Sequence, residues 1–303
     1  MSEERRAGAK ACWCGLLALL VLLSGCHAVG PIARPKKAQP GITDGLIDVG
    51  GLSLHVHCLG QGSPIVILEA GLGNDGSVWK GVQREVARST RACVYDRAGT
   101  GYSDPAPTPH PNRQMARELY QLVTHAGLTG PYVLVGHSMG GVNVRLFEAE
   151  HPELVVGVVL VDATVDPLRS RSVLPEDELK KFKEMLPAVG EGVDLESFAS
   201  GAAEARAAKG LGSKPLVVLT RSVEDEQPWA SPEQRAELLR IWQEQQVELP
   251  KLSSNAVQVV VRNSHHYIQL DAPRLVVASI AEVVNAVRSG ARLNEAALTS
   301  LNR

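Results

Sequence analysis

Ser138 stands in the pentapeptide GHSMG (residues 136–140), which matches the pattern Gly-x-Ser-x-Gly. An apolar run at residues 131–135 (PYVLV) leads directly into it, and a predicted helix at residues 139–150 follows. The pattern alone is weak, but a strand-to-helix turn is the setting in which it carries a nucleophile. Glycines let such a tight turn form without clashes, and the helix N-terminus directs free N–H groups at developing negative charge. The sequence therefore predicts a nucleophilic serine.

The remainder of the chain alternates apolar runs with helical patterns, which predicts the elements that hold this serine. Predicted strands cover residues 64–70, 91–95, 131–135, 155–161, 215–220 and 256–261, and a predicted hairpin pairs 46–49 with 52–58. Predicted helices cover residues 78–87, 112–126, 139–150 and 273–288, the last with Asp271 as its N-cap and Gly290 at its end. This alternation predicts an α/β fold, a mostly parallel sheet covered by helices on both faces. The C-terminal ends of its strands would share one edge, where ligands bind.

Two segments resemble a known superfamily. GHSMGG after its apolar strand resembles the nucleophile turn of the α/β-hydrolase superfamily, and YDRAGTGYSD (residues 95–104) resembles a segment of its esterase-like members. The resemblance extends from about residue 46 to residue 288. It implies the α/β-hydrolase fold, a Ser–His–acid triad and an oxyanion hole.

A serine hydroxyl is a poor nucleophile until a base takes its proton, so the proposed chemistry needs a histidine. The resemblance implies that this base is His266. His266 follows the predicted strand 256–261 and lies at the superfamily's spacing before Pro273. The superfamily usually has Gly-His at this place, whereas this chain has His265-His266, so the register is open by one residue.

The oxyanion hole needs two donors near the attacked carbonyl group. The resemblance implies the backbone N–H groups of Met139, which follows the nucleophile, and of Leu72, which follows the strand 64–70. The superfamily often has His-Gly where this chain has Ala70-Gly71. That change removes a side chain and keeps the backbone donor.

Two strand ends could supply the acid that orients the histidine and stabilises its cation. Asp162 ends the strand 155–161, a position that certain haloalkane dehalogenases use. Glu224 and Asp225 follow the strand 215–220, the usual position in the superfamily. Asp162 could instead be a structural acceptor, and Glu224 part of a solvated charge run. We place Asp162 first, Glu224 as the alternative and Asp225 below both.

Residues 166–213 contain no predicted strand but two weak helical stripes. This length exceeds that of ordinary connections, which favours a small helical cap inserted between two strands, although a connecting helix with a long loop would also fit.

The formal net charge of −2 gives no electrostatic reason to expect nucleic-acid binding. No Cys/His spacing resembles a zinc site, and the expected chemistry requires neither a metal nor a cofactor.

The N-terminus reads as a secretory signal, with basic residues before an apolar run and small residues at its end. An uncleaved N-terminal anchor is the alternative. The apolar run ends in Leu-Ser-Gly-Cys (residues 23–26), which resembles the lipobox of bacterial lipoproteins. That resemblance implies cleavage after residue 25 and acylation of Cys26. We therefore expect a signal peptide (1–25), a tether (26–41) and an α/β-hydrolase domain (42–303), exported and held at a membrane through Cys26. Cys58 and Cys93 could form a disulfide or remain free thiols.

These features together predict a serine hydrolase that cleaves carboxylic ester-type bonds of small to medium apolar substrates through an acyl-enzyme. Thioesterase, lactonase and C–C hydrolase activities share such a site. The alternative is a small-molecule binding or sensing protein that uses the same fold with a weak or inactive triad.

Overall fold

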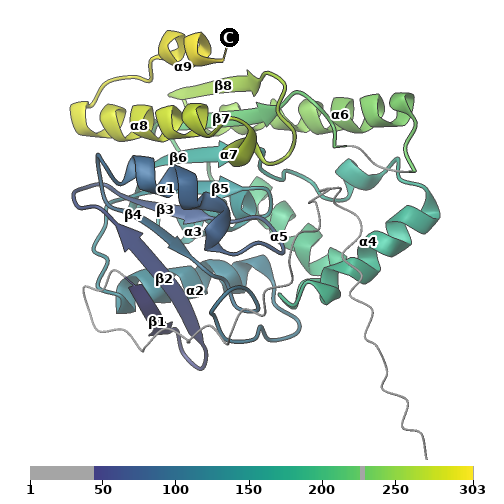
Figure 1. Cartoon of the computed structure of the whole chain (residues 1–303), viewed down its shortest axis with the longest axis horizontal. Coiled ribbons are helices and arrows are strands. Elements are labelled where there is room, and N and C mark those ends of the chain that lie inside the picture. The colour runs from purple at the N-terminus through teal and green to yellow at the C-terminus, as the bar shows by residue number, and fades with distance from the viewer. Residues whose placement is uncertain (1–43, 226–228, 303) are drawn as a thin grey trace, which may run out of the picture.

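A computed structural model describes residues 44–225 and 229–302. These residues form an eight-stranded sheet in the order β1-β2-β4-β3-β5-β6-β7-β8 (Figure 1). The strands are β1 (Asp44–Asp48), β2 (Ser53–Leu59), β3 (Ile65–Glu69), β4 (Ala92–Tyr95), β5 (Tyr132–His137), β6 (Val155–Val161), β7 (Leu216–Arg221) and β8 (Ala256–Val261). Strands β1 and β2 pair antiparallel, β2 pairs antiparallel with β4, and the strands from β4 to β8 are parallel.

Helices cover both faces of the sheet, and the two-residue period of the strands assigns each side chain to one face. In β3, Ile65 and Ile67 belong to the core under α2 and α3, whereas Val66 and Leu68 belong to the core under α1 and α8. The helices outside the β6–β7 connection are η1 (Gly76–Trp79), α1 (Lys80–Val86), α2 (Asn112–His125), α3 (Gly140–Glu150), α6 (Pro232–Gln246), η3 (Leu249–Leu252), α7 (Ile268–Asp271), α8 (Pro273–Ser289) and α9 (Glu295–Leu301). The predicted mostly parallel, doubly covered α/β sheet is confirmed.

The connection between β6 and β7 contains η2 (Arg169–Arg171), α4 (Glu176–Ala188) and α5 (Leu195–Ala207). Helix α4 projects away from the sheet (Figure 1) and buries little besides Glu178 and Leu186. Helix α5 instead packs against α2 and α3 and contributes Phe198 to the core. Only the first half of the segment expected to be a cap therefore stands out from the domain.

Helix α8 begins and ends for different reasons. Gly290 adopts φ 67° at its C-cap, as the sequence predicted. Its N-cap is Ala272 and not Asp271, because Asp271 is the last residue of the preceding helix α7. The Asp271 carboxylate instead accepts a hydrogen bond from the His265 N–H at 2.7 Å. Asp271 therefore ties down the histidine-bearing loop, and its expected capping role was wrong.

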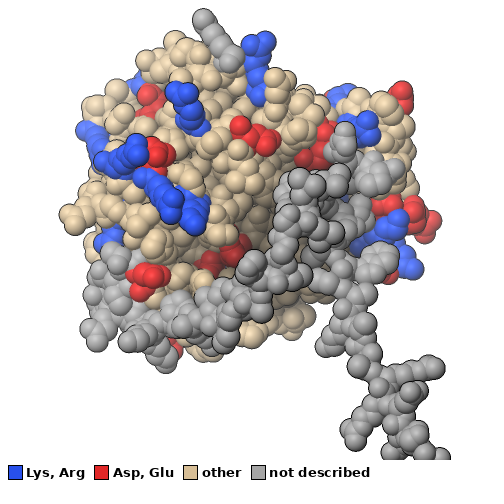
Figure 2. All heavy atoms as spheres, viewed as in Figure 1, with Lys and Arg blue, Asp and Glu red and all other residues tan. Residues whose placement is uncertain are grey.

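Cys58 and Cys93 are directly paired across β2 and β4 and form a disulfide. The expected signal peptide, tether and Cys26 lie outside the described residues. Among residues 44–225 and 229–302, no helix has the length and apolar character needed to cross a membrane. The face in Figure 2 carries both basic and acidic side chains among its described residues, in keeping with the near-zero net charge.

Candidate active site

Ser138 occupies the sharp turn between β5 and α3. Its φ of 53° lies in the left-handed region, which a non-glycine residue adopts at an energetic cost. The neighbouring glycines make the turn possible. A Cβ on Gly140 would lie 2.5 Å from the carbonyl oxygen of Ala70, and one on Gly136 would lie 2.7 Å from the carbonyl oxygen of Gly140. The predicted strand, turn and helix thus present Ser138 at the C-terminal edge of the sheet.

His266 lies between Ser138 and Asp162, although more than a hundred residues separate it from each. Its Nε2 is 2.9 Å from the hydroxyl oxygen of Ser138, and its Nδ1 is 2.6 Å from Oδ2 of Asp162. The neighbouring His265 is about half exposed and faces Asp271 at 3.5 Å. The structure therefore brings together Ser138, His266 and Asp162, and it turns His265 away from them.

Asp162 is completely buried and its carboxylate accepts several hydrogen bonds. Oδ1 accepts from the backbone N–H of Arg221 at 3.0 Å and from the indole Nε1 of Trp242 at 2.8 Å. Oδ2 accepts from Nη1 of Arg221 at 2.9 Å in addition to His266. Burial alone would raise the pKa of Asp162, but the charge of Arg221 and the hydrogen bond from His266 lower it to about 2. The carboxylate is therefore ionised throughout the neutral range.

Glu224, the alternative acid, contacts a different partner. Its carboxylate accepts from Nη2 of Arg221 at 2.5 Å, so Arg221 bridges Glu224 and Asp162. The guanidinium also stacks on the ring of Trp242, 4.4 Å from its centroid. In this geometry Glu224 holds the arginine, and Asp162 contacts the imidazole.

Neither Arg221 nor Trp242 stands out in the sequence. Arg221 is the last residue of β7, one position beyond the predicted strand, and Trp242 lies on α6, a helix that the sequence pattern did not predict. A cation that follows an apolar strand and precedes two acidic residues is the only available signal for Arg221.

The expected oxyanion donors belong to residues that adjoin the nucleophile: Met139 follows Ser138 in sequence, and Leu72 follows Gly71, which packs against Ser138. Gly71 approaches the serine so closely that a Cβ there would be 3.2 Å from the Cβ of Ser138. Among the hydrogen bonds of residues 44–225 and 229–302, none uses the backbone N–H of Leu72 or of Met139. Two backbone donors without a partner among the described residues, on residues that adjoin the nucleophile in sequence or packing, suit an anion that forms only during a reaction.

His137, next to the nucleophile, is wholly buried. Burial, followed by the proximity of His266, lowers the pKa of His137 to about 3, so its ring is neutral at neutral pH. Its Nε2–H donates to the backbone carbonyl oxygen of His266 at 3.0 Å. His137 therefore supports the loop that carries the candidate base, and the imidazole in hydrogen-bond contact with Ser138 is that of His266.

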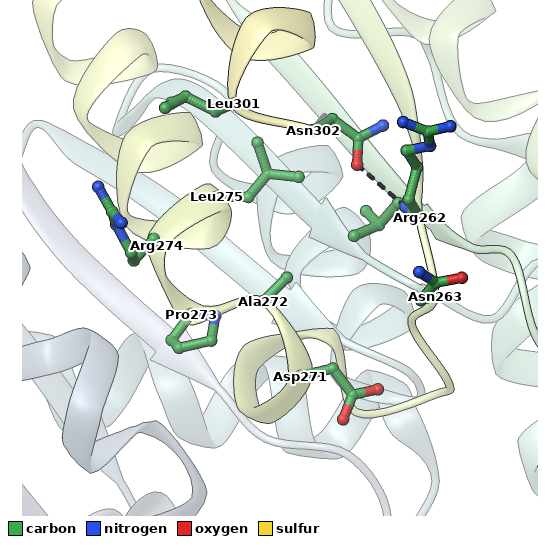
Figure 3. Close-up of a pocket in the computed structure, with 10 residues that line it drawn as sticks. Arg262, Asn263, Asp271, Ala272, Pro273, Arg274, Leu275, Leu301 and Asn302 are labelled. Atoms are coloured by element: carbon green, nitrogen blue, oxygen red, sulfur yellow. Dashed lines mark hydrogen bonds between the residues drawn. The ribbon is translucent and has the colours of Figure 1, made fainter.

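A surface cavity of about 450 Å³ lies on the outer side of the same loop (Figure 3). It is lined by the end of β8 and by α7, α8 and α9, and Asp271, Arg262 and Arg274 contribute its charges. None of Ser138, His266 or Asp162 lines it, so it is separate from the candidate site. The described residues contain no cluster of three or more His, Cys, Asp or Glu side chains arranged to hold a metal ion.

Comparison with known proteins agrees with the observed fold. Residues 64–207 match the family model described as alpha/beta hydrolase fold. The protein YqjL of Bacillus subtilis is 28% identical over 238 residues, which cover 78% of this chain and 89% of that protein. An esterase from Thermogutta terrifontis superposes with a TM-score of 0.57 and 21% identity, covering 81% of this chain and 99% of its own. An enol-lactonase from Burkholderia xenovorans gives 0.55 and 19%, covering 79% and 99%. The two superpositions show a shared fold.

Proposed function

We propose that this chain, an α/β-hydrolase by its fold and by its family match, is a serine hydrolase that cleaves carboxylic ester-type bonds. The observation that carries the proposal is the hydrogen-bonded series Ser138–His266–Asp162, with distances of 2.9 and 2.6 Å. Nucleophile, base and orienting acid in hydrogen-bond contact are the arrangement that acyl transfer requires.

In the proposed reaction, the Ser138 hydroxyl attacks the substrate carbonyl carbon while Nε2 of His266 takes its proton. Asp162 holds the Nδ1–H of the imidazole and stabilises the imidazolium that forms. The N–H groups of Leu72 and Met139 donate to the oxyanion. His266 then protonates the leaving alcohol, and a water molecule activated by the same base releases the acid and regenerates Ser138.

We propose substrates with small to medium apolar acyl or alcohol groups. The β6–β7 connection exposes several apolar side chains, among them Leu168 (54%), Val173 (39%) and Met185 (41%). Covering such surface with an apolar group is favourable by about 25 cal/mol per Å². Thioesters and lactones undergo the same attack, and esterase and lactonase neighbours share the fold.

Hydrolysis of a p-nitrophenyl ester series graded from acetate to decanoate, with thioester and lactone arms, tests this proposal. Wild-type protein should turn over the shorter chains best, and Ser138→Ala should lose the activity while remaining folded. A fluorophosphonate should label the wild type at Ser138. Absence of labelling and of turnover in folded wild type, combined with saturable binding of the esters, would establish the alternative small-molecule binding protein.

We also propose that the protein is exported and anchored through a lipid on Cys26. The Cys58–Cys93 disulfide supports export, because disulfides persist mainly in oxidising compartments. An alkyne-labelled fatty acid fed to expressing bacteria should label the protein, and Cys26→Ser should remove the label and release the protein from the membrane fraction. Labelling that survives Cys26→Ser would contradict the anchor.

A further inference from the structure

Two buried carboxylates flank the guanidinium of Arg97 beneath the oxyanion loop, residues 70–73. Oε1 of Glu69 accepts from Nη1 at 2.9 Å. Glu191 accepts from Nε at 2.6 Å and from Nη2 at 3.0 Å, a two-point contact. All three side chains are at most 3% exposed. Burial alone would lower the pKa of Arg97, but Glu191 and Glu69 raise it, so the guanidinium is charged.

Arg97 fixes the peptide group that carries the Leu72 donor. Its Nη2 donates to the carbonyl oxygen of Gly71 at 2.6 Å, and its Nη1 donates to that of Ala70 at 2.7 Å. The Gly71 carbonyl and the Leu72 N–H belong to one planar peptide unit and point in opposite directions. Because Arg97 holds the carbonyl, it also sets the direction of the N–H on the other side.

Glu191 fixes the next peptide group. Its Oε1 accepts from the Gly73 N–H at 2.5 Å, and the carbonyl oxygen of the same unit, that of Leu72, accepts from Nδ2 of Asn74 at 3.1 Å. Both peptide units around the Leu72 Cα are therefore held by hydrogen bonds. Glu191 takes part in this twice, directly through Gly73 and indirectly through Arg97.

Glu191 does not belong to the sheet or to the oxyanion loop. It lies in a strap, residues 189–193, that follows α4 in the β6–β7 connection. Gly190 and Gly192 flank it with φ of 85° and 68°. A Cβ on Gly192 would be 2.0 Å from the carbonyl oxygen of Pro107, so the strap lies directly against the domain.

His110 provides a further attachment for the strap. Its backbone N–H donates to the carbonyl oxygen of Gly192 at 2.9 Å, and its Nδ1 is 3.1 Å from the carbonyl oxygen of Glu191. Its Nε2 is 2.9 Å from Glu118, which fixes the ring. The strap is thus a pinned segment between the projecting helix α4 and the packed helix α5.

We propose that Glu191 is a positioning residue through which the β6–β7 connection aligns the oxyanion hole. The inference rests on the proposed function, because it assigns Glu191 a part in that reaction. It implies that a displacement of α4 that shifts the strap would also turn the Leu72 N–H away from the oxyanion.

The variant Glu191→Gln tests the proposal, because its amide keeps the shape of the side chain but presents a donor to Arg97 or to the Gly73 N–H. We expect kcat for a p-nitrophenyl ester to fall by about 10- to 100-fold, somewhat less than the loss of an entire oxyanion donor, while KM changes by less than about threefold. Glu148→Gln is the matched control. Glu148 is also buried (4% exposed) and pairs with Lys214 at 2.6 Å, remote from the oxyanion loop, so kcat should not change.

Amide hydrogen exchange gives a readout that does not require turnover. In the wild type, the Gly73 amide should exchange at least about 100-fold more slowly than an unprotected amide, and Glu191→Ala, which leaves the Gly73 N–H without its acceptor, should remove that protection. If ester turnover is absent from the wild type, the proposed function fails, but exchange still reports on the alignment. A folded Glu191→Gln with wild-type kcat, or a folded Glu191→Ala in which the Gly73 amide stays protected, would overturn the proposal. If neither variant folds, Glu191→Asp replaces them, and fast exchange at Gly73 in the wild type would also overturn the proposal.

Discussion

Replacing Asp162 by asparagine should remove the function of the candidate base with little change in shape. In the preferred orientation, the amide oxygen accepts from the backbone N–H of Arg221 and from Trp242, as Oδ1 does now. The amide nitrogen then faces Nδ1 of His266 and Nη1 of Arg221, which are both donors in the native protein. In the opposite orientation, the amide nitrogen would face the Arg221 backbone N–H and the Trp242 indole N–H. Neither of these donors can become an acceptor, so this orientation is less favourable.

The imidazole of His266 can respond by moving its proton to Nε2. Nδ1 then accepts from the amide, but Nε2 presents a proton to the Ser138 hydroxyl where it now presents a lone pair. The serine therefore loses its general base, although the imidazole itself need not move; the guanidinium of Arg221, which remains a donor, has to withdraw from the amide nitrogen. The corresponding change in a Ser-His-Asp protease lowers kcat by about 10⁴-fold. We expect a loss of about 10³- to 10⁴-fold, equivalent to about 4 to 5.5 kcal/mol in the activation free energy.

Steady-state hydrolysis of p-nitrophenyl butyrate, together with thermal unfolding, measures this effect. Glu224→Gln is the companion variant, because it removes the other carboxylate on Arg221 and leaves the contact between Asp162 and His266 intact. It should lower kcat by less than about tenfold. A folded Asp162→Asn that keeps more than a tenth of wild-type kcat, alongside an inactive Glu224→Gln, would refute the reasoning and make Glu224 the acid.

Three further outcomes follow from the packing and the charges. Gly140→Ala should lower the free energy of unfolding by at least about 1–3 kcal/mol, because its Cβ would collide with a backbone carbonyl; wild-type urea unfolding would contradict this. The double variant Cys58→Ser/Cys93→Ser should lose about 2–4 kcal/mol of stability in the same assay and keep its kcat. Burial alone would lower the pKa of His55, but its hydrogen bonds to Asp96 and Asp44 raise that pKa above 6.5 in the folded protein. The free energy of folding that His55 contributes is therefore complete below pH 6.5 and is lost as the pH rises through the pKa of the folded state. The melting temperature of His55→Asn should accordingly approach that of the wild type as pH increases from 5.5 to 8.5, and a pH-independent difference would count against this.

The strands and the nucleophile turn could be predicted because their signals are local. Continuous apolar runs have few alternatives to a buried strand, and the glycines around Ser138 fit only a tight turn. Helix α6 was missed because its sequence is mostly polar and buries few side chains, among them Ile241 and Trp242. With so few buried positions, the helical period is too weak to detect.

The choice of acid could not be made from the sequence. Asp162 and Glu224 both follow apolar strands, and nothing local distinguishes their environments. The geometry favours Asp162 because Trp242 and Arg221 enclose its carboxylate against His266, and Trp242 comes from the helix that was not predicted. Glu191 was equally hidden, since it lies between two glycines in an irregular segment, and its partners are far away in sequence.

The Cys58–Cys93 bond also determines how the domain would respond to mechanical load. For a chain tethered through Cys26, as we propose, a pull would reach the described residues at Asp44, the first residue of edge strand β1 and the partner of His57 in β2. Strand β1 would unzip from β2, and β2 would then begin to peel from β4. The disulfide stops this after residues 44–57, about 50 Å of extended chain, and passes the force to β4 within the sheet. The covalent link would therefore limit the extension. Tension on the anchor would unfold the β1–β2 hairpin before it reached the strands that lead to Ser138 and Asp162.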